Sequence, residues 1–281
     1  MAASSWNSLL IIIIFFFFFL MASCSADTNS FQGCVCGTSP MNARSRWAAN
    51  LNAVFNSLAA NVSAGGYYRA EAGRGSDRAF GLIQCRGDVS PTDCVECTRH
   101  SFALAAKFCG GSKTAVVWQR WCLLRYSNAT FYGQWEGSGA AILPVNSTGL
   151  GDPAAADAGM NMVFQLAGDA PNAKSMFARS PDVGRSWKGY GLAQCTRDLA
   201  RSDCGDCLNH FLKTFQSEVR NKTSWEIYGQ GCFIQFDDHQ FYFNSSISLG
   251  RPNSANAANT AWGGLFTILS GTMVMVIVTF F

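Results

Sequence analysis

A cysteine array with the spacing C-x8-C-x2-C occurs twice in this chain, and every cysteine of the second copy lies at one constant offset from its counterpart in the first. One further cysteine follows each array at the same distance. The first copy contains Cys85, Cys94, Cys97 and Cys122, and the second contains Cys195, Cys204, Cys207 and Cys232. Self-similarity at a fixed offset is the signature of a repeated structural unit. The chain is therefore predicted to fold as one unit copied twice.

The N-terminal segment and the glycosylation motifs indicate the compartment. An apolar run covers residues 9–21 and small residues follow it as far as Ala26, which is typical of a signal peptide over 1–26. Five N-x-S/T motifs follow, at Asn61, Asn128, Asn146, Asn221 and Asn244. Together with the many cysteines, these features predict a secreted glycoprotein in an oxidising compartment.

The C-terminal segment predicts attachment to a membrane. No charged residue follows Arg251, and a polar spacer over 246–261 precedes an apolar tail over 262–281. The tail is long enough to span a bilayer, but a span normally ends in cytoplasmic lysine or arginine. A small-residue region, a spacer and a terminal apolar tail are also the parts of a GPI-attachment signal. The GPI anchor is the favoured alternative, and either one would tether the folded part outside the cell.

The cysteines are predicted to form disulfide bonds, because zinc would need a second ligand pair and a redox site would need a βαβ context. The first copy also contains Cys109 and an N-terminal Cys34 or Cys36, and the second copy lacks both counterparts. Their joint absence indicates that Cys109 pairs with Cys34 or with Cys36. One thiol is then left over, which is unusual in a secreted protein.

Each copy shows the same order of secondary-structure signals. Apolar residues from Trp47 to Leu58 follow helical spacing, and Ser90 followed by Pro91 is typical of the start of a second helix. One strand is expected over 115–126 and another over 130–135.

This order predicts an α+β unit, with helices on one face of an antiparallel sheet. The expected organisation is a first domain at 31–136, a linker at 137–156 and a second domain at 157–245.

The full cysteine pattern, with C-x11-C from Cys97 to Cys109 and C-x12-C from Cys109 to Cys122, resembles the ginkbilobin-like domain. This domain is also called the stress-antifungal or salt-stress-response domain. The resemblance covers both copies and implies a five-stranded antiparallel sheet with two helices in each. It also implies the disulfides Cys85–Cys94, Cys97–Cys122, Cys195–Cys204 and Cys207–Cys232, and a pairing of Cys109 with Cys34 or Cys36.

Tandem copies of this domain without a kinase are similar to cysteine-rich repeat secretory proteins and plasmodesmata-located proteins. The resemblance implies a non-enzymatic recognition or adaptor protein at the outer face of the plasma membrane or at plasmodesmata. Its role would be in cell-to-cell communication or in stress and defence signalling. Its ligand would be an extracellular protein or a cell-wall glycan, and it could form homo- or hetero-oligomers. The alternatives are an antifungal carbohydrate-binding protein and an extracellular thiol redox protein.

Single-domain antifungal relatives bind mannose through an asparagine, an arginine and an acidic residue. Carried over, the first copy offers Gly37 or Val35, Val116 and Ser127, and the second offers Glu226 and Asp237. Only Asp237 has the required chemistry. A carboxylate without its arginine partner does not reproduce that sugar site, so mannose binding by this route is not expected.

No constellation of residues argues for catalysis, a cofactor or a metal site. The recurring acidic residues Asp88, Asp93, Asp198 and Asp203 are interpreted as helix caps and turn residues. His100 and His210 recur as well and are interpreted as partly buried, hydrogen-bonded helix residues. A net charge of +3, with 14% charged residues, argues against nucleic-acid binding.

Overall fold

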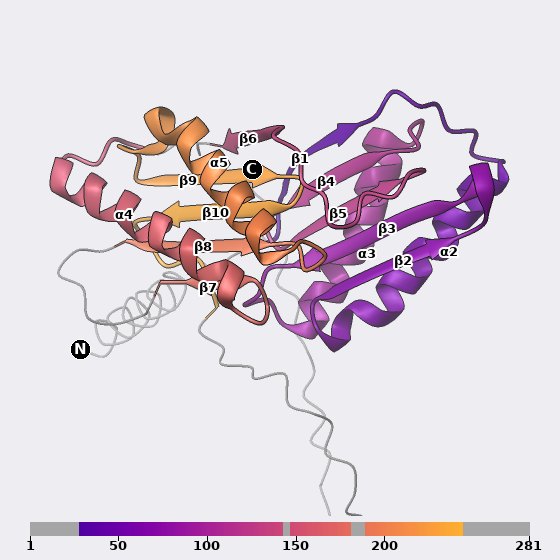
Figure 1. Cartoon of the computed structure of the whole chain (residues 1–281), viewed down its shortest axis with the longest axis horizontal. Coiled ribbons are helices and arrows are strands. Elements are labelled where there is room, and N and C mark those ends of the chain that lie inside the picture. The colour runs from indigo at the N-terminus through magenta and orange to yellow at the C-terminus, as the bar shows by residue number, and fades with distance from the viewer. Residues whose placement is uncertain (1–27, 143–146, 181–188, 244–281) are drawn as a thin grey trace, which may run out of the picture. The chain divides into compact units, whose positions relative to one another are not determined.

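The computed structural model describes residues 28–142, 147–180 and 189–243 (Figure 1). These residues form two repeats, each with a five-stranded antiparallel sheet and two helices, which confirms the predicted fold class. The predicted signal peptide, Asn146, Asn244, the polar spacer and the apolar tail lie outside the described residues. Among the residues that are described, no helix is both long and apolar enough to cross a membrane.

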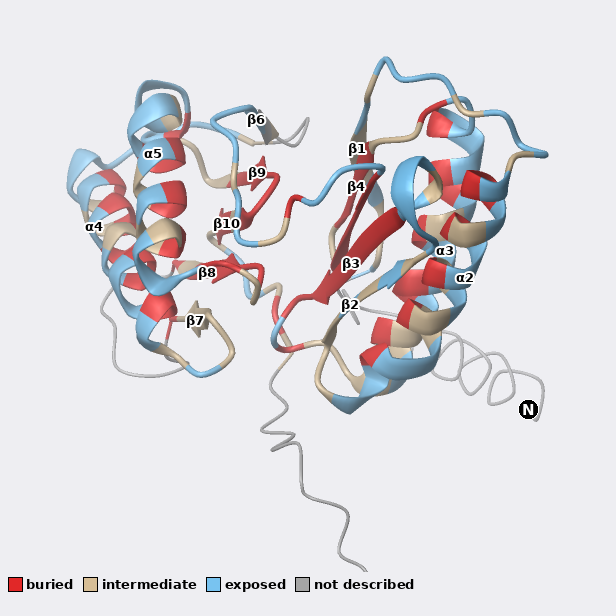
Figure 2. Cartoon of the chain, turned by 45° about the vertical axis from the view of Figure 1, so that its right-hand side comes forward, coloured by how far each residue is buried: buried red, intermediate tan, exposed pale blue. Residues whose placement is uncertain are grey.

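The first repeat has the strand order β1-β4-β5-β3-β2, and both of its helices pack on one face of the sheet. Its elements are β1 (Phe31–Cys36), α2 (Arg46–Asn61), η1 (Val62–Ala64), β2 (Tyr67–Ala72), η2 (Gly75–Asp77), β3 (Ala79–Cys85), α3 (Pro91–Cys109), β4 (Ala115–Gln119) and β5 (Cys122–Ser127). Every residue of β3, β4 and β5 is buried, as Figure 2 shows for much of β3. Both faces of this sheet are therefore covered.

The second repeat has the equivalent order β6-β9-β10-β8-β7. Its elements are β6 (Gly139–Ile142), α4 (Pro153–Asp169), η3 (Ala170–Asn172), β7 (Phe177–Arg179), β8 (Tyr190–Cys195), α5 (Arg201–Val219), β9 (Ser224–Gly229) and β10 (Cys232–Asp237). Strand β6 lies inside the segment that the sequence predicts as a linker, and it pairs with β9 at the edge of the sheet. Its sequence, Gly-Ala-Ala-Ile, is short and poor in strand-forming residues, so composition gave no strand signal.

The helix predictions agree with the structure. Ser90 caps α3 by accepting a hydrogen bond from the Asp93 amide, and Pro91 occupies the first turn. The apolar side of α2 is buried through Trp47, Leu51, Val54 and Leu58. The local signals for these helices therefore match the contacts that the helices make.

Both strand predictions for the first repeat are wrong. The run 115–126 contains two strands, β4 and β5, which pair in a hairpin around Arg120 and Trp121. Neither turn residue is glycine, proline or asparagine, so no local signal marked the turn. The segment 130–135 is not a strand. Its Tyr132 hydroxyl instead donates to the Ala70 carbonyl, 2.8 Å away, on the sheet.

The buried apolar side chains of the described residues form three clusters. Two lie between the helices and the sheet, one in each repeat. The third draws on both repeats: Phe80, Leu82, Val116, Trp118, Leu123 and Phe131 from the first, and Tyr228 and Phe233 from the second. Successive strand residues point to opposite faces, so Val117 joins the first core while Trp118 joins the third cluster. The sheet faces that carry no helix thus contact each other.

Five disulfides staple the repeats, and they are the pairs that the resemblance implies. They are Cys36–Cys109, Cys85–Cys94, Cys97–Cys122, Cys195–Cys204 and Cys207–Cys232. Cys36, not Cys34, is the partner of Cys109, and Cys34 is a free, half-buried thiol. In the second repeat, the buried Val219 takes the place of Cys109.

Candidate functional site

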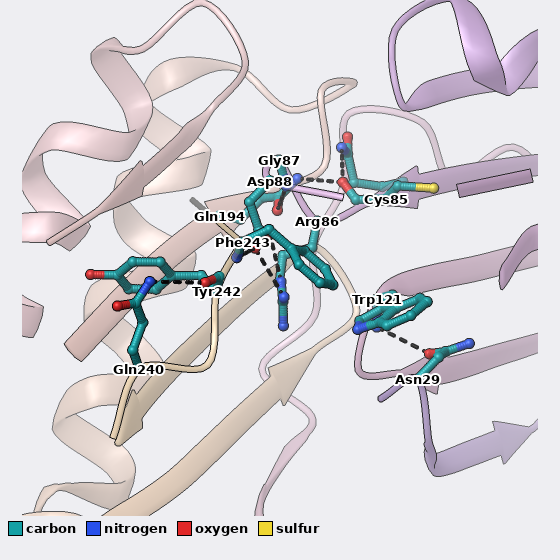
Figure 3. A network of polar contacts seen from close by, with 11 residues as sticks. Asn29, Cys85, Arg86, Gly87, Asp88, Trp121, Gln194, Gln240, Tyr242 and Phe243 are labelled. Carbon is teal, nitrogen blue, oxygen red and sulfur yellow. Dashed lines mark hydrogen bonds and ion pairs between the residues drawn. The ribbon is translucent and has the colours of Figure 1, made fainter. Parts of the chain in front are cut away.

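A buried polar network joins the two repeats (Figure 3). Arg86 follows β3, and its Nε donates to Asp88 Oδ1 at 2.7 Å while Nη2 donates to Oδ2 at 3.0 Å. Both side chains are almost fully buried, with 2% and 3% exposed. Asp88 Oδ2 also accepts the backbone N–H of Phe243 from the second repeat, at 2.9 Å. A buried ion pair is tolerated when further hydrogen bonds satisfy it, so this pair depends on the second repeat.

A glutamine makes a second link beside this pair. Gln194, on β8, donates through Nε2 to the Cys85 carbonyl at 2.9 Å. Its Oε1 accepts the backbone N–H of Gly87 at 3.1 Å. One side chain from the second repeat therefore satisfies two backbone groups at the end of β3.

The contacts across the junction follow the internal repeat. Asp198 is the counterpart of Asp88 in the second copy, and its Oδ2 accepts the N–H of Gly133 at 2.9 Å. Gly133 in turn is the first-copy counterpart of Phe243. Each repeat thus supplies an aspartate that accepts a backbone N–H from the other repeat. Such reciprocal contacts are characteristic of a two-fold related interface.

Asp88 and Asp198 lie in turns, as predicted, but their carboxylates also accept hydrogen bonds across the junction, which the interpretation of the recurring acids as caps and turns does not include. It holds for Asp93, whose amide and carboxylate both bond to Ser90, and Asp203 lies in the first turn of α5. The two histidines form the expected hydrogen bonds: His100 Nδ1 lies 2.7 Å from Gln119 Oε1, and His210 Nε2 lies 3.4 Å from the Gly137 carbonyl. The expected partial burial is wrong, because both side chains lie on exposed faces of their helices.

A cavity of about 410 Å³ opens beside the network, between the two repeats. The first repeat contributes Ser63, Gly65 and Gly66, and the second contributes Lys174, Ser175 and Arg197. A second open pocket of about 500 Å³ shares Ser63 and Pro91 with the first and extends along the start of α3. A volume of this size is sufficient for a small-molecule ligand or one end of an oligomer.

The charge of this cavity is positive. Asp88 is already committed to Arg86, and no described carboxylate forms an ion pair with the exposed Lys174. The Arg197 guanidinium donates to the Gly65 carbonyl and lies over the ring of Tyr67, and burial lowers the pKa of this arginine. Burial, together with the charge of Asp198, raises the pKa of the Tyr67 hydroxyl well above its usual range. Besides the Arg86–Asp88 pair, two further cations, Lys174 and Arg197, therefore line this cavity.

A profile of the salt stress response/antifungal family matches residues 20–129 and 157–239, which covers both repeats. The chain belongs to the salt stress response/antifungal family. It is 31% identical over 201 residues to the antimicrobial ginkbilobin-2-like protein of Castanea crenata, covering 71% of this chain and 83% of that protein. It is 25% identical over 254 residues to cysteine-rich repeat secretory protein 55 of Arabidopsis thaliana, covering 84% of this chain and 94% of that protein.

The tandem arrangement also has a solved counterpart. The tandem DUF26 ectodomain of the cysteine-rich receptor-like protein PDLP8 from Arabidopsis thaliana superposes with a TM-score of 0.64 at 22% identity. The match covers 74% of this chain and 97% of that structure. At this identity the likeness shows a shared fold of two adjacent domains.

The side chains at the sugar-binding positions that the family resemblance implies make contacts within the protein. Glu226 is buried in the junction, where it pairs with Arg120 at 3.1 Å and accepts from the Tyr228 hydroxyl at 2.5 Å. Asp237 accepts from Ser224 Oγ at 2.6 Å, and burial raises its pKa although the hydrogen bond from Ser224 lowers it. No arginine forms an ion pair with Asp237 among the described residues.

The first-repeat counterparts also differ from a sugar site. Val116 is buried in the cluster between the repeats, and Ser127 Oγ lies 3.2 Å from Thr114 Oγ1. The Gly37 carbonyl accepts from Ser112 Oγ at 2.7 Å. Gly37 and Ser127 therefore both contact the segment 112–114, and none of these three positions supplies the charged side chain that the sugar site requires.

Two groups of described residues bring metal-type ligand atoms within 4.8 Å of one another. In the first, Cys36 and Cys109 are joined in a disulfide next to Cys34. In the second, Asp237 ends β10 and is half-buried, as is Asp238, and His239 Nδ1 already bonds to Asp238 at 2.6 Å. Neither group is a preorganised ligand set of the kind that structural metal sites require.

The sequence did not identify the junction residues. Asp88, Asp198 and Gln194 recur at the repeat offset, and this recurrence was the available signal. Arg86 and Lys174 have no such signal, because the second copy has Thr196 at the position of Arg86 and the first copy has Ala64 at the position of Lys174. The roles of these two residues depend on the packing of one repeat against the other.

Proposed function

We propose that this chain is a non-enzymatic extracellular recognition or adaptor protein, tethered to the outer face of the plasma membrane and acting in cell-to-cell communication or in stress and defence signalling. Membership of the family, the signal sequence and the glycosylation motifs support an extracellular site of action. The relatives carry names such as secretory protein and receptor-like protein, which agree with this location.

The observation that carries the proposal is the cavity between the repeats. It has a ligand-sized volume of about 410 Å³ and is lined by Lys174 and Arg197, while Asp88, the acid in its lining, is paired with Arg86. Lysine and arginine at such a site favour a carboxylate or another anionic group, since charge-assisted hydrogen bonds are stronger than neutral ones. The proposed ligand class is therefore a cell-wall glycan or an extracellular protein segment that presents an acidic group.

Binding of acidic and neutral cell-wall polysaccharides to the purified full chain tests this proposal. Polygalacturonate is the acidic probe and a neutral mannan is the matched probe. Lys174→Gln is expected to weaken binding of the acidic probe about tenfold, the loss of one charge-assisted contact of roughly 1.5 kcal/mol. Lys213→Gln, at an exposed lysine on α5 outside the cavity, should leave binding unchanged. Equal binding of both probes, or equal effects of both substitutions, would exclude the cavity as the site.

The mode of attachment has its own test. The full chain, tagged after the signal peptide and expressed in plant cells, should be released by phosphatidylinositol-specific phospholipase C if the apolar tail is replaced by a GPI anchor. Retention after this treatment would indicate a true span. Recovery in the medium without any treatment would show that the chain is not tethered.

A further inference from the structure

Three sulfur atoms meet where β1 crosses the end of α3. The Cys34 thiol lies within 4.8 Å of both sulfurs of the Cys36–Cys109 bridge. Cys34 and Cys36 are two residues apart on one strand, so their side chains point to the same face. Cys109 is the last residue of α3, which packs on that face. A free thiol is thus held beside a disulfide by two elements of regular structure.

We propose that this cluster is a thiol–disulfide exchange site, in which Cys34 takes Cys109 from Cys36 and leaves the free thiol at Cys36. The Cys34 thiolate attacks Sγ of Cys109, the Cys34–Cys109 bond forms and the Cys36–Cys109 bond breaks. The electron pair of the broken bond goes to Cys36, which takes up a proton equivalent to the one that Cys34 lost. The number of disulfides is unchanged, so the step needs no oxidant and no reductant.

Strand geometry selects the sulfur that is attacked. Attack on Cys36 would join two residues of one extended strand, whose β-carbons are held roughly 6.6 Å apart by the rise of the strand. A disulfide needs β-carbons about 3.5–4.5 Å apart. Attack on Cys109 instead yields another bridge from β1 to α3. The closed loop becomes only two residues longer than the present one, so its closure entropy is nearly the same.

The exchange would move the thiol from a covered to an open position. Cys34 is half-buried and packs against the first core, and its pKa is raised by burial. Cys36 is exposed, and it lies next to the exposed Val35 on a strand at the edge of the sheet. The reactive thiol of the exchanged form would therefore be accessible to a second cysteine-containing molecule, while that of the form in the structure is shielded.

Alkylation followed by mapping of the bridges tests the proposal on the intact chain. The protein is incubated at about pH 8.5, where a thiol near its usual pKa is partly ionised, and then trapped with N-ethylmaleimide and digested without reduction. One label per chain is expected, divided between Cys34 and Cys36 in amounts within about tenfold of each other, because the two loops are nearly equal in length. Peptides that contain a Cys34–Cys109 bridge should appear in parallel. Label on Cys34 alone after prolonged incubation would overturn the proposal.

Two matched substitutions give an independent measurement. In Cys36→Ser the thiol of Cys34 is expected to bridge to Cys109, so that native protein has no free thiol. Cys34→Ser should keep the Cys36–Cys109 bridge and accept no label. Two free thiols in folded Cys36→Ser would show that Cys34 cannot replace Cys36. If Cys36→Ser does not fold, the labelling of the unsubstituted chain still decides between the two outcomes.

Discussion

The two repeats have the same topology but different internal supports. Both keep the two bridges that tie the second helix of the repeat to its neighbouring strands. Only the first has a third bridge, from β1 to the end of α3, and the second has the buried Val219 at that helix position. The comparison teaches that two bridges and a core suffice for the fold, and that the third bridge adds stability to one copy.

The junction shows the same kind of asymmetry. Asp88 and Asp198 make equivalent backbone contacts to the opposite repeat. Asp88 also neutralises the buried Arg86, whereas the counterpart of Arg86 in the second repeat is Thr196. Asp88 therefore balances the charge of a buried arginine. Asp198 has no arginine at the equivalent position and accepts the N–H of Gly133.

The largest effect is expected when the first repeat is made to resemble the second. The variant Cys34→Ser, Cys36→Ser, Cys109→Val removes the bridge that closes 73 residues and introduces the valine of the second repeat. The free energy of unfolding of the first repeat should fall by about 4 kcal/mol, mainly because the unfolded chain is no longer cross-linked. Hydrogen-exchange mass spectrometry can follow β3 and α3 separately from β8 and α5.

Cys34→Ser alone is the control for this variant, because it leaves all five described bridges in place. Equal loss of protection in both repeats would mean that the bridge stabilises the whole described body. No loss in either repeat would mean that the third bridge does not distinguish them.

A smaller effect is expected at the junction, and it should differ between the two aspartates. Asp88→Ala leaves Arg86 buried without its carboxylate, and breaking a buried pair in this way costs about 3 kcal/mol. Asp198→Ala removes an acceptor from Gly133 N–H and should cost about 1 kcal/mol. Chemical denaturation of the two variants measures this difference. Similar losses would show that the Arg86 charge does not separate the two positions.

Asp88→Asn serves as the control for charge. It keeps an oxygen for the Phe243 N–H but removes the negative charge beside Arg86. A stability between those of Asp88→Ala and the unsubstituted chain is expected. Full recovery would assign the effect to the backbone hydrogen bond rather than to the ion pair.

The features that could be predicted from the sequence are those marked by neighbouring residues or by a regular spacing. Cysteine spacing, with the family resemblance, implied the bridges, and Ser90 with Pro91 marked the start of α3. Only the structure could show whether Cys34 or Cys36 pairs with Cys109, because both lie on the same face of β1. The hairpin turn at Arg120 and Trp121 had no turn residue to reveal it.

The junction could not be predicted for a different reason. An aspartate that accepts a backbone N–H within its own turn and one that accepts from a distant repeat look alike in sequence. Asp88 and Asp93 both recur at the repeat offset, but only Asp88 contacts the other repeat. Their recurrence in both copies shows that each unit has an aspartate at these positions. It does not show which group the carboxylate contacts, because that depends on how the two sheets pack.

The smallest effect concerns a backbone position at which the repeats have different residues. Gly66 and Met176 occupy equivalent sites, and their carbonyls accept the N–H groups of Cys85 and Cys195 at 2.7 and 2.9 Å. Both have left-handed backbones, with φ of 71° at Gly66 and 50° at Met176. This conformation costs a residue with a β-carbon about 1 kcal/mol, whereas glycine adopts it freely.

Met176 also packs against the second core, so replacing it loses side-chain contacts as well as changing the backbone preference. The backbone effect is therefore measured between two variants that both lack the methionine side chain. Met176→Gly is therefore expected to be more stable than Met176→Ala by about 1 kcal/mol, the reverse of the order in a helix. Gly66→Ala, which would meet no atom closer than 3.5 Å, should cost a similar amount in the first repeat. Urea denaturation of the three variants gives the differences. If Met176→Ala were the more stable of its pair, the left-handed backbone at Met176 would not be a source of strain, and the repeats would be equivalent at this turn.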